Sequence, residues 1–162
     1  LLDGYRPEDS HAAQMAALPQ ILQYSDFFGI SLYPYMGVYL TDQVPASMWS
    51  ALFGLSAKPI AITESGYPSV TFTIASLPAT FNTDPSKQNA FVSRLLQEAD
   101  QRRFKYVVNF ASRDYDPLWA VLPASQQELA LVWRNTGLFD QFGTPRPAQT
   151  AWQAALSRSY RE

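Results

Sequence analysis

The sequence contains no cysteine and a single histidine, His11. Disulfide bonds and thiolate chemistry are therefore excluded, as are a histidine-based metal cluster and a Ser-His-Asp triad. No apolar run reaches the roughly 18 residues of a membrane-spanning helix, so we expect no membrane span. We also expect neither a cofactor nor a metal ion. The compartment stays open, because a secreted or periplasmic protein need not use disulfides.

Charged residues are also scarce, at 16% of the 162 residues, and the formal net charge is -2. A nucleic-acid partner would usually require a basic face, so none is expected. Apolar and aromatic residues are plentiful, at 47% and 14%. The length suits one domain over residues 1–162 with a sizeable core. Part of the aromatic surplus could line a groove for a flat, hydroxylated ligand.

The segment KPIAITESGYPS, residues 58–69, is the most informative part of the chain. Its short apolar run ends in one acidic residue, Glu64, and a glycine turn follows at once. An apolar run bounded by turn signals is typical of a buried strand in a parallel sheet. A carboxylate at the carboxyl end of such a strand stands where α/β folds place catalytic groups. Glu64 is therefore the leading catalytic candidate, and a carboxylate that caps a turn is the alternative.

The rest of the chain predicts strands and helices in alternation. Besides the strand that ends near Glu64, strands are predicted over 26–33 and 105–110. Helices are predicted over 11–24, 45–55, 85–103, 125–134 and 147–158, the third of them capped by Asp84. Long loops are predicted over 65–83 and 111–123, where loops that follow strands usually shape binding sites. The alternation predicts parallel strands joined through helices.

Three motifs occur in order along the chain. Residues 26–35 read DFFGISLYPY, residues 63–66 read TESG, and residues 137–148 begin with GLFD and end with PRPA. Together they resemble strand six, strand seven and the closing segment of the retaining glycoside hydrolases with a (β/α)8 barrel. That clan includes β-galactanases, β-mannanases, cellulases and β-galactosidases. Its seventh strand carries the catalytic nucleophile in a T-E-x-G motif.

The resemblance implies an α/β fold that is the C-terminal portion of a (β/α)8 TIM barrel. About three βα units, strands six to eight with their helices, would be present. A full barrel takes about 250 residues, so the earlier strands would lie outside this chain. The sheet would then have open edges and an exposed inner face. We therefore expect a partner, either the missing N-terminal part of the barrel or another copy through self-association.

The same resemblance implies roles for individual residues. Glu64 would be the nucleophile, and Tyr33 the tyrosine that hydrogen-bonds the nucleophile and keeps it ionised and oriented. Strand alternation puts Tyr35 on the same side as Tyr33, so Tyr35 is an alternative for that role and a candidate for substrate binding. Packing at the rim of the site is the other interpretation of both tyrosines.

Three more residues are candidates for binding a carbohydrate substrate. Phe110 stands where many clan members have the tryptophan that forms the floor of the sugar subsite. Trp119, in the following loop, could replace it. Asp114 is a candidate sugar-binding group in the same loop, and a solvated loop acid is the alternative. Core or loop packing is the alternative for the two aromatic residues.

Retaining hydrolysis requires two carboxylates about 5 Å apart, one as nucleophile and one as proton donor. The clan carries the donor in an Asn-Glu pair, and this sequence contains no such dipeptide. The resemblance thus implies a hydrolase of β-linked poly- or oligosaccharides whose acid/base glutamate is absent here, and we expect the chain alone to be inactive. The alternatives are a non-catalytic barrel domain that binds carbohydrate or is purely structural, and an unrelated α/β fold.

Overall fold

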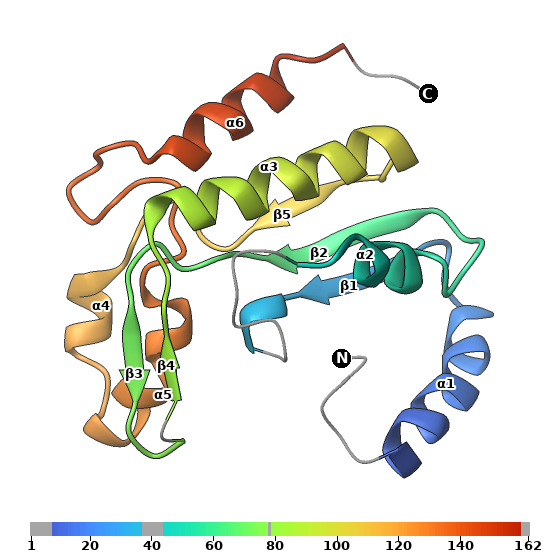
Figure 1. Cartoon of the computed structure of the whole chain (residues 1–162), viewed down its shortest axis with the longest axis horizontal. Helices are drawn as coiled ribbons and strands as arrows, with labels where there is room; N and C mark the ends of the chain where they lie inside the picture. Colours follow the sequence, from blue (N-terminus) through green and yellow to red (C-terminus); the bar gives the residue numbers. More distant parts are fainter. Residues whose placement is uncertain (1–7, 37–43, 78, 160–162) are drawn as a thin grey trace.

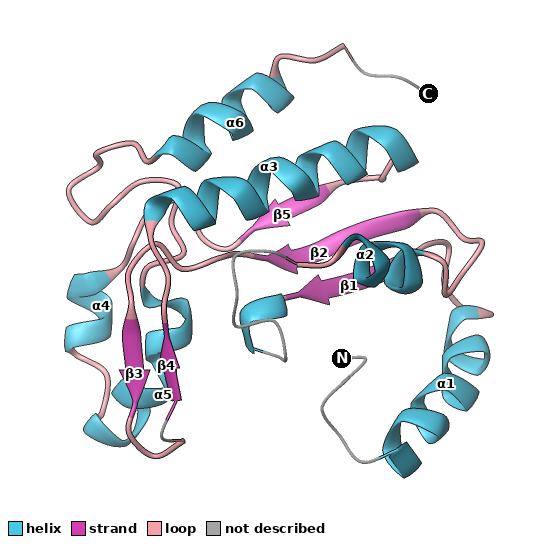
Figure 2. Cartoon of the chain, in the orientation of Figure 1, coloured by secondary structure: helices cyan, strands magenta, loops and turns pink. Residues whose placement is uncertain are grey.

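The computed structural model describes residues 8–36, 44–77 and 79–159 (Figures 1 and 2). The described elements, in chain order, are α1 (Glu8–Leu22), β1 (Phe28–Leu32), the short 3-10 helix η1 (Pro34–Met36), α2 (Ala46–Phe53), β2 (Ile60–Ser65), β3 (Phe72–Ile74), β4 (Ala79–Phe81), α3 (Pro85–Arg102), β5 (Val107–Asn109), α4 (Asp116–Ala120), α5 (Ala124–Arg134) and α6 (Pro147–Leu156). None of the helices in this described part is long and apolar enough to cross a membrane.

Strands β1, β2 and β5 form one parallel sheet with β2 at its centre. Their arrows point the same way in Figure 1. Helix α2 lies in the connection from β1 to β2, and α3 lies in the connection from β2 to β5. The parallel strands joined through helices, expected from the alternation in the sequence, are confirmed. The carboxyl ends of the three strands therefore meet at one edge of the sheet.

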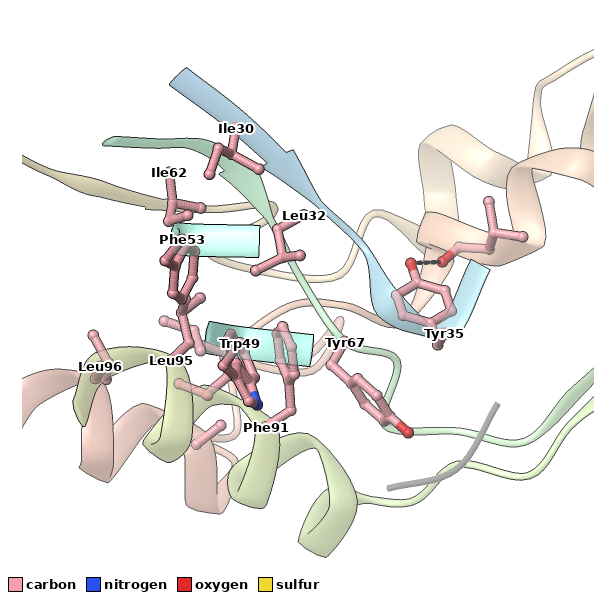
Figure 3. Close-up of a cluster of buried hydrophobic side chains, with 14 of the residues drawn as sticks. Ile30, Leu32, Tyr35, Trp49, Phe53, Ile62, Tyr67, Phe91, Leu95 and Leu96 are labelled. Atoms are coloured by element: carbon pink, nitrogen blue, oxygen red, sulfur yellow. Dashed lines mark hydrogen bonds between the residues drawn. The ribbon is translucent and has the colours of Figure 1, made fainter. Parts of the chain in front are cut away.

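The core lies between one face of this sheet and the helices α2 and α3. In β1, buried Ile30 and Leu32 alternate with exposed residues. Figure 3 shows these side chains directed toward aromatic residues of the two helices, which include Trp49 of α2 and Phe91 of α3. The ring centroids of Trp49 and Phe91 are 5.9 Å apart. Full burial of one side chain of this kind contributes about 1.5–3 kcal/mol, so this packing fixes which face of the sheet is covered.

The two segments predicted as loops contain secondary structure. Residues 65–83 include the antiparallel hairpin of β3 and β4, in which Phe72 pairs with Phe81 and their rings stack with centroids 4.6 Å apart. The hydroxyls of Thr73 and Thr80 lie 3.0 Å apart across the same hairpin. Residues 111–123 include α4. The hairpin has three cross-strand pairs and α4 has five residues, and elements this short leave too short a pattern in the sequence to be recognised.

The predicted portion of a (β/α)8 barrel is wrong. The described residues form an open sheet of three parallel strands and a separate sheet of two antiparallel strands, and they close no barrel. A barrel of that type closes with eight strands, and three strands leave two free edges. The fold is an open α/β arrangement of the described elements. The assignment of residues 1–162 to a single domain stays a prediction.

The sheet face away from α2 and α3 is left open by the described residues. It carries the exposed Gly29 and Ser31 of β1 together with Tyr106, Val108 and Phe110 along and beside β5. Val108 is 44% exposed. Parallel sheets are normally covered on both faces, because their crossover helices lie there. An apolar face of this kind favours contact with further polypeptide.

We predict that the isolated 162-residue chain self-associates through this face. Val108→Asp places a charge in the middle of it and should shift the chain toward monomer, because burying an unpaired carboxylate is costly. Leu156→Asp is the matched control, since Leu156 is 67% exposed at the end of α6. Sedimentation velocity over a range of concentrations measures the outcome. A wild-type chain that stays monomeric throughout, or an equal effect of both substitutions, would contradict the prediction.

Candidate functional site

Strand β2 has one residue more than its neighbour β1 over the same stretch. Ile30 pairs with Ile62, but the next residue of β1, Ser31, pairs with Glu64. Thr63 is the extra residue, and the register against β5 also shifts within this part of β2. A bulge of this kind bends the strand and moves the side chains that follow it to the opposite faces.

The bulge decides where the carboxylate of Glu64 points. Glu64 lies opposite Ser31, which is on the open face, and Ser65 lies opposite Leu32, which is on the core face. Glu64 is accordingly half-buried and Ser65 fully buried. Strict alternation after the buried Ile62 would have placed Glu64 among the core side chains instead.

Tyr33 directly follows β1 on the same face as Glu64. Its hydroxyl donates a hydrogen bond to Oε1 of Glu64 over 2.6 Å. Burial raises the pKa of Tyr33 well above its ordinary value, and the hydrogen bond to Glu64 raises it further, while a hydrogen bond with the Trp133 side chain acts in the opposite direction. Tyr33 is therefore a neutral donor that holds Glu64 in one orientation.

Phe110 follows β5 on the other side of β2. It is 37% exposed, and its ring meets that of Tyr115 edge to face, with centroids 6.2 Å apart. Gly66 permits the close approach of this strand end, because a Cβ at that position would clash with the carbonyl oxygen of Phe110. The Phe110–Ala111 peptide bond is cis. Glu64 thus stands between residues contributed by the ends of both neighbouring strands.

Tyr35, the alternative to Tyr33, lies in the core. It is fully buried, and its hydroxyl donates a hydrogen bond to the carbonyl oxygen of Val132 over 2.7 Å (Figure 3). Its ring meets that of Tyr33 edge to face, with centroids 6.0 Å apart, but the strand alternation ends at Leu32 because the chain turns into η1 at Pro34. The side chain of Tyr35 therefore presents no surface to a substrate, contrary to the expectation from the sequence.

Asp114 also has a structural role, because its carboxylate is hydrogen-bonded to other parts of the chain. One carboxylate oxygen accepts hydrogen bonds from the backbone of Gly137 and from Arg146, both over 2.9 Å, and the other accepts from Asn135 over 3.2 Å and from Arg146. The side chain is 1% exposed and that of Arg146 is 11% exposed. Asp114 is accordingly neither a solvated loop acid nor a group free to bind a sugar.

Trp119, expected as a sugar platform, lies in α4 and is half-buried. Its indole donates to the carbonyl oxygen of Gln127 over 2.9 Å, and the guanidinium of Arg134 lies 3.9 Å from its ring centroid. Arg134 also pairs with Asp116. These contacts join α4 to α5, and none of them brings Trp119 to Glu64.

Two residues near the site were given no role by the sequence. Trp133 of α5 lies close enough to Tyr33 to lower the pKa of its hydroxyl, against the effects of burial and Glu64. Gln88, at the start of α3, is fully buried and donates its amide hydrogens to the carbonyl oxygens of Tyr67 and Gly137, each over 3.0 Å. A glutamine in the buried stripe of a helix is a usable sequence signal for such a link, whereas the helical spacing of Trp133 fits packing equally well.

No second carboxylate is bonded to Glu64 among the residues that the structure describes. Glu98 is held by Arg94 and Arg102 along α3, and Asp114 is held by Arg146. The described residues also include no group of three acids or histidines placed to hold a metal ion. The site formed by this part of the chain is therefore one carboxylate with one phenolic donor, open on the uncovered face of the sheet.

No protein-family model matches the sequence, and no curated protein matches it. Solved structures do match. A Bifidobacterium dentium β-glucuronidase complexed with coumarin-3-O-glucuronide has 15% identity over 85% of this chain, with a TM-score of 0.57. A Faecalibacterium prausnitzii β-glucuronidase has 16% identity over 98%, with a TM-score of 0.56. A GH2 β-galacturonidase from Eisenbergiella tayi, bound to galacturonate, has 15% identity over 87%, with a TM-score of 0.55.

The chain shares its fold with a part of these glycoside hydrolases. It spans 22%, 30% and 25% of the three chains, so each of them is several times longer. The identities are low enough that the similarity concerns the fold alone. The relationship to glycoside hydrolases inferred from the sequence is supported at this level, and the roles of Glu64, Tyr33 and Phe110 stay predictions.

The raised pKa of Tyr33 predicts a specific behaviour in alkali. An unfolded tyrosine ionises near pH 10, whereas folded Tyr33 stays neutral above that pH. Its contribution to stability is thus complete below pH about 10 and is lost as the pH rises further. Tyr33→Phe should therefore leave the rise in tyrosinate absorbance between pH 9 and 11 unchanged while the protein is folded. A smaller rise in the variant would show that Tyr33 ionises in this range.

The buried pair of Asp114 and Arg146 predicts a large effect on stability. Asp114→Ala leaves the guanidinium buried without its partner and should cost about 3–5 kcal/mol in the free energy of unfolding. Asp116→Ala is the matched control, because its partner Arg134 is 30% exposed. We expect the control to cost about 1 kcal/mol. Urea unfolding measures both values, and similar losses in the two variants would refute the structural role of Asp114.

Proposed function

We propose that this chain is part of a retaining glycoside hydrolase that cleaves β-linked poly- or oligosaccharides, with Glu64 as the catalytic nucleophile. The observation that carries the proposal is the hydrogen bond from the neutral Tyr33 hydroxyl to Glu64, on the open face at the carboxyl end of the sheet. Strand ends of this kind are where α/β folds bind ligands. The shared fold with parts of glycoside hydrolases supports the same conclusion.

In the proposed reaction, an oxygen of Glu64 attacks the anomeric carbon of the sugar. The bond from that carbon to the leaving oxygen breaks, and a glycosyl ester of Glu64 forms. Water then hydrolyses the ester and regenerates the carboxylate. Tyr33 holds the carboxylate through Oε1, which leaves Oε2 as the oxygen that attacks. Phe110, exposed directly after β5, the neighbour of β2, is the proposed aromatic contact for the sugar ring.

The leaving oxygen must receive a proton from a second carboxylic acid, about 5 Å from the nucleophile in retaining enzymes. Among the described acids, Glu98, Asp114 and Asp116 are paired with arginines and are not placed to donate this proton. We propose that a glutamate from polypeptide outside this chain supplies the proton. The same polypeptide would cover the open face of the sheet.

A non-catalytic carbohydrate-binding domain is the second candidate. The pairing of Glu98, Asp114 and Asp116 with arginines favours it, because these acids are then not free to donate a proton. In that case Glu64 would contribute at most a hydrogen bond to the ligand, and Glu64→Gln would leave carbohydrate affinity nearly unchanged. Calorimetric titration with oligosaccharides separates the two functions, because only the enzyme consumes its ligand.

The proposal predicts that Glu64→Gln abolishes turnover in the protein that contains this chain. The amide is nearly the same size but is not a nucleophile, so activity should fall below detection while folding is unaffected. Chromogenic β-glucuronides and β-galacturonides are the first substrates to assay, since two neighbours with the same fold are named for these sugars. β-Galactosides and β-mannosides complete the panel.

Glu128→Gln is the control, because Glu128 lies in α5 and its carboxylate accepts from the backbone of Ser76 over 3.0 Å. A 2-fluoroglycoside with a good leaving group should label the peptide that carries Glu64, and mass spectrometry locates the adduct. A Glu64→Gln protein that keeps wild-type turnover, or an adduct on another residue, would refute the assignment of the nucleophile.

A further inference from the structure

Ser65 ends strand β2 directly after Glu64. Its side chain is fully buried on the core face of the sheet. Its hydroxyl donates a hydrogen bond to the carbonyl oxygen of Leu32 over 2.8 Å. Leu32 is the last residue of β1 and directly precedes Tyr33. The Ser65 hydroxyl thus joins the two strands one residue from each partner of the Tyr33–Glu64 hydrogen bond.

The position of this bond matters because of the bulge. Between Ile62 and Glu64, the extra Thr63 interrupts the regular register of β2 against β1. A bulge disrupts the ladder of backbone hydrogen bonds locally and increases the twist. Beyond it only the pairs Ser31 with Glu64 and Leu32 with Ser65 remain before β1 ends. The buried hydroxyl supplies a link between the strands in this short stretch.

We infer that Ser65 is a positioning residue that sets the separation of Tyr33 and Glu64. A buried hydrogen bond is more rigid than one in water, because no solvent competes for the carbonyl oxygen. The hydroxyl of Ser65 fixes the backbone of Leu32 against that of β2. Tyr33 directly follows Leu32 and Glu64 directly precedes Ser65, so the same hydrogen bond also fixes the backbone from which these two side chains extend. The consequence for catalysis rests on the proposed function, whereas the consequence for the hydrogen bond between Tyr33 and Glu64 does not.

Ser65→Ala tests the inference, and Ser69→Ala is its matched control. Ser69 is also buried, and its hydroxyl also donates to a backbone carbonyl, that of Asn135, over 3.1 Å. The two variants therefore lose the same chemical group and one hydrogen bond of the same type. They differ in which segments that bond joins, since only Ser65 is bonded to β1.

The first measurement is the NMR chemical shift of Tyr33, with tyrosine isotopically labelled at Cζ and the resonance assigned from Tyr33→Phe. This shift responds to the hydrogen bond that the hydroxyl makes. Ser65→Ala should move the resonance, and Ser69→Ala should leave it in place. An unchanged resonance in Ser65→Ala, or an equal change in both variants, would overturn the inference.

The second measurement is steady-state kinetics of the whole protein. Misplacement of the carboxylate by a fraction of an ångström should lower kcat on the order of 10- to 100-fold, with KM nearly unchanged. Ser69→Ala should keep both constants. If the protein cleaves no glycoside but the Tyr33 resonance moves as expected, the proposed function fails and the role of Ser65 stands. Equal kcat values for Ser65→Ala and wild type in an active protein would overturn it.

Discussion

The covered face of the sheet imposes the constraint on which the site depends. Helices α2 and α3 bury Ile62 in β2, and a strand of regular alternation would carry Glu64 onto the same buried face two residues later. A carboxylate buried there without a partner would cost several kcal/mol. The extra residue Thr63 removes this conflict by turning Glu64 toward the open face and Ser65 toward the core. The core and the carboxylate can therefore belong to one short strand.

The main elements could be predicted because their signals are long or chemically specific. Helix α3 has an apolar stripe over several turns, and Asp84 caps it by accepting hydrogen bonds from the backbone of Ser86 and Lys87 over 2.8 and 2.9 Å. The apolar run before Glu64 likewise predicted a buried strand, and the structure shows that it is the central one. The nearness of Glu64 and Tyr33 was implied by the resemblance of their motifs to the glycoside hydrolase clan, and the two motifs do lie on neighbouring parallel strands.

The remaining features depend on contacts that a linear pattern does not contain. The bulge at Thr63 is defined by pairing with β1, and no residue type marks it. The turn at Pro34 redirects Tyr35 into the core, although alternation along β1 had suggested the opposite side. The arginine that neutralises Asp114 lies 32 residues further along the chain. The barrel was a wrong prediction because motifs in the right order describe neighbouring segments and carry no information about closure.

The buried amide of Gln88 has a consequence for how this fold can vary. It connects the first turn of α3 to the loop after Glu64, at Tyr67, and to the segment before the last helix, at Gly137. Insertions or deletions in either loop would pull one carbonyl oxygen away from a side chain that water cannot reach. Length changes in the two loops must therefore evolve together or be absorbed in the β3–β4 hairpin, where the exposed Thr73 and Thr80 face solvent. A search for distant relatives should accordingly allow gaps in the hairpin and few near Tyr67 and Gly137.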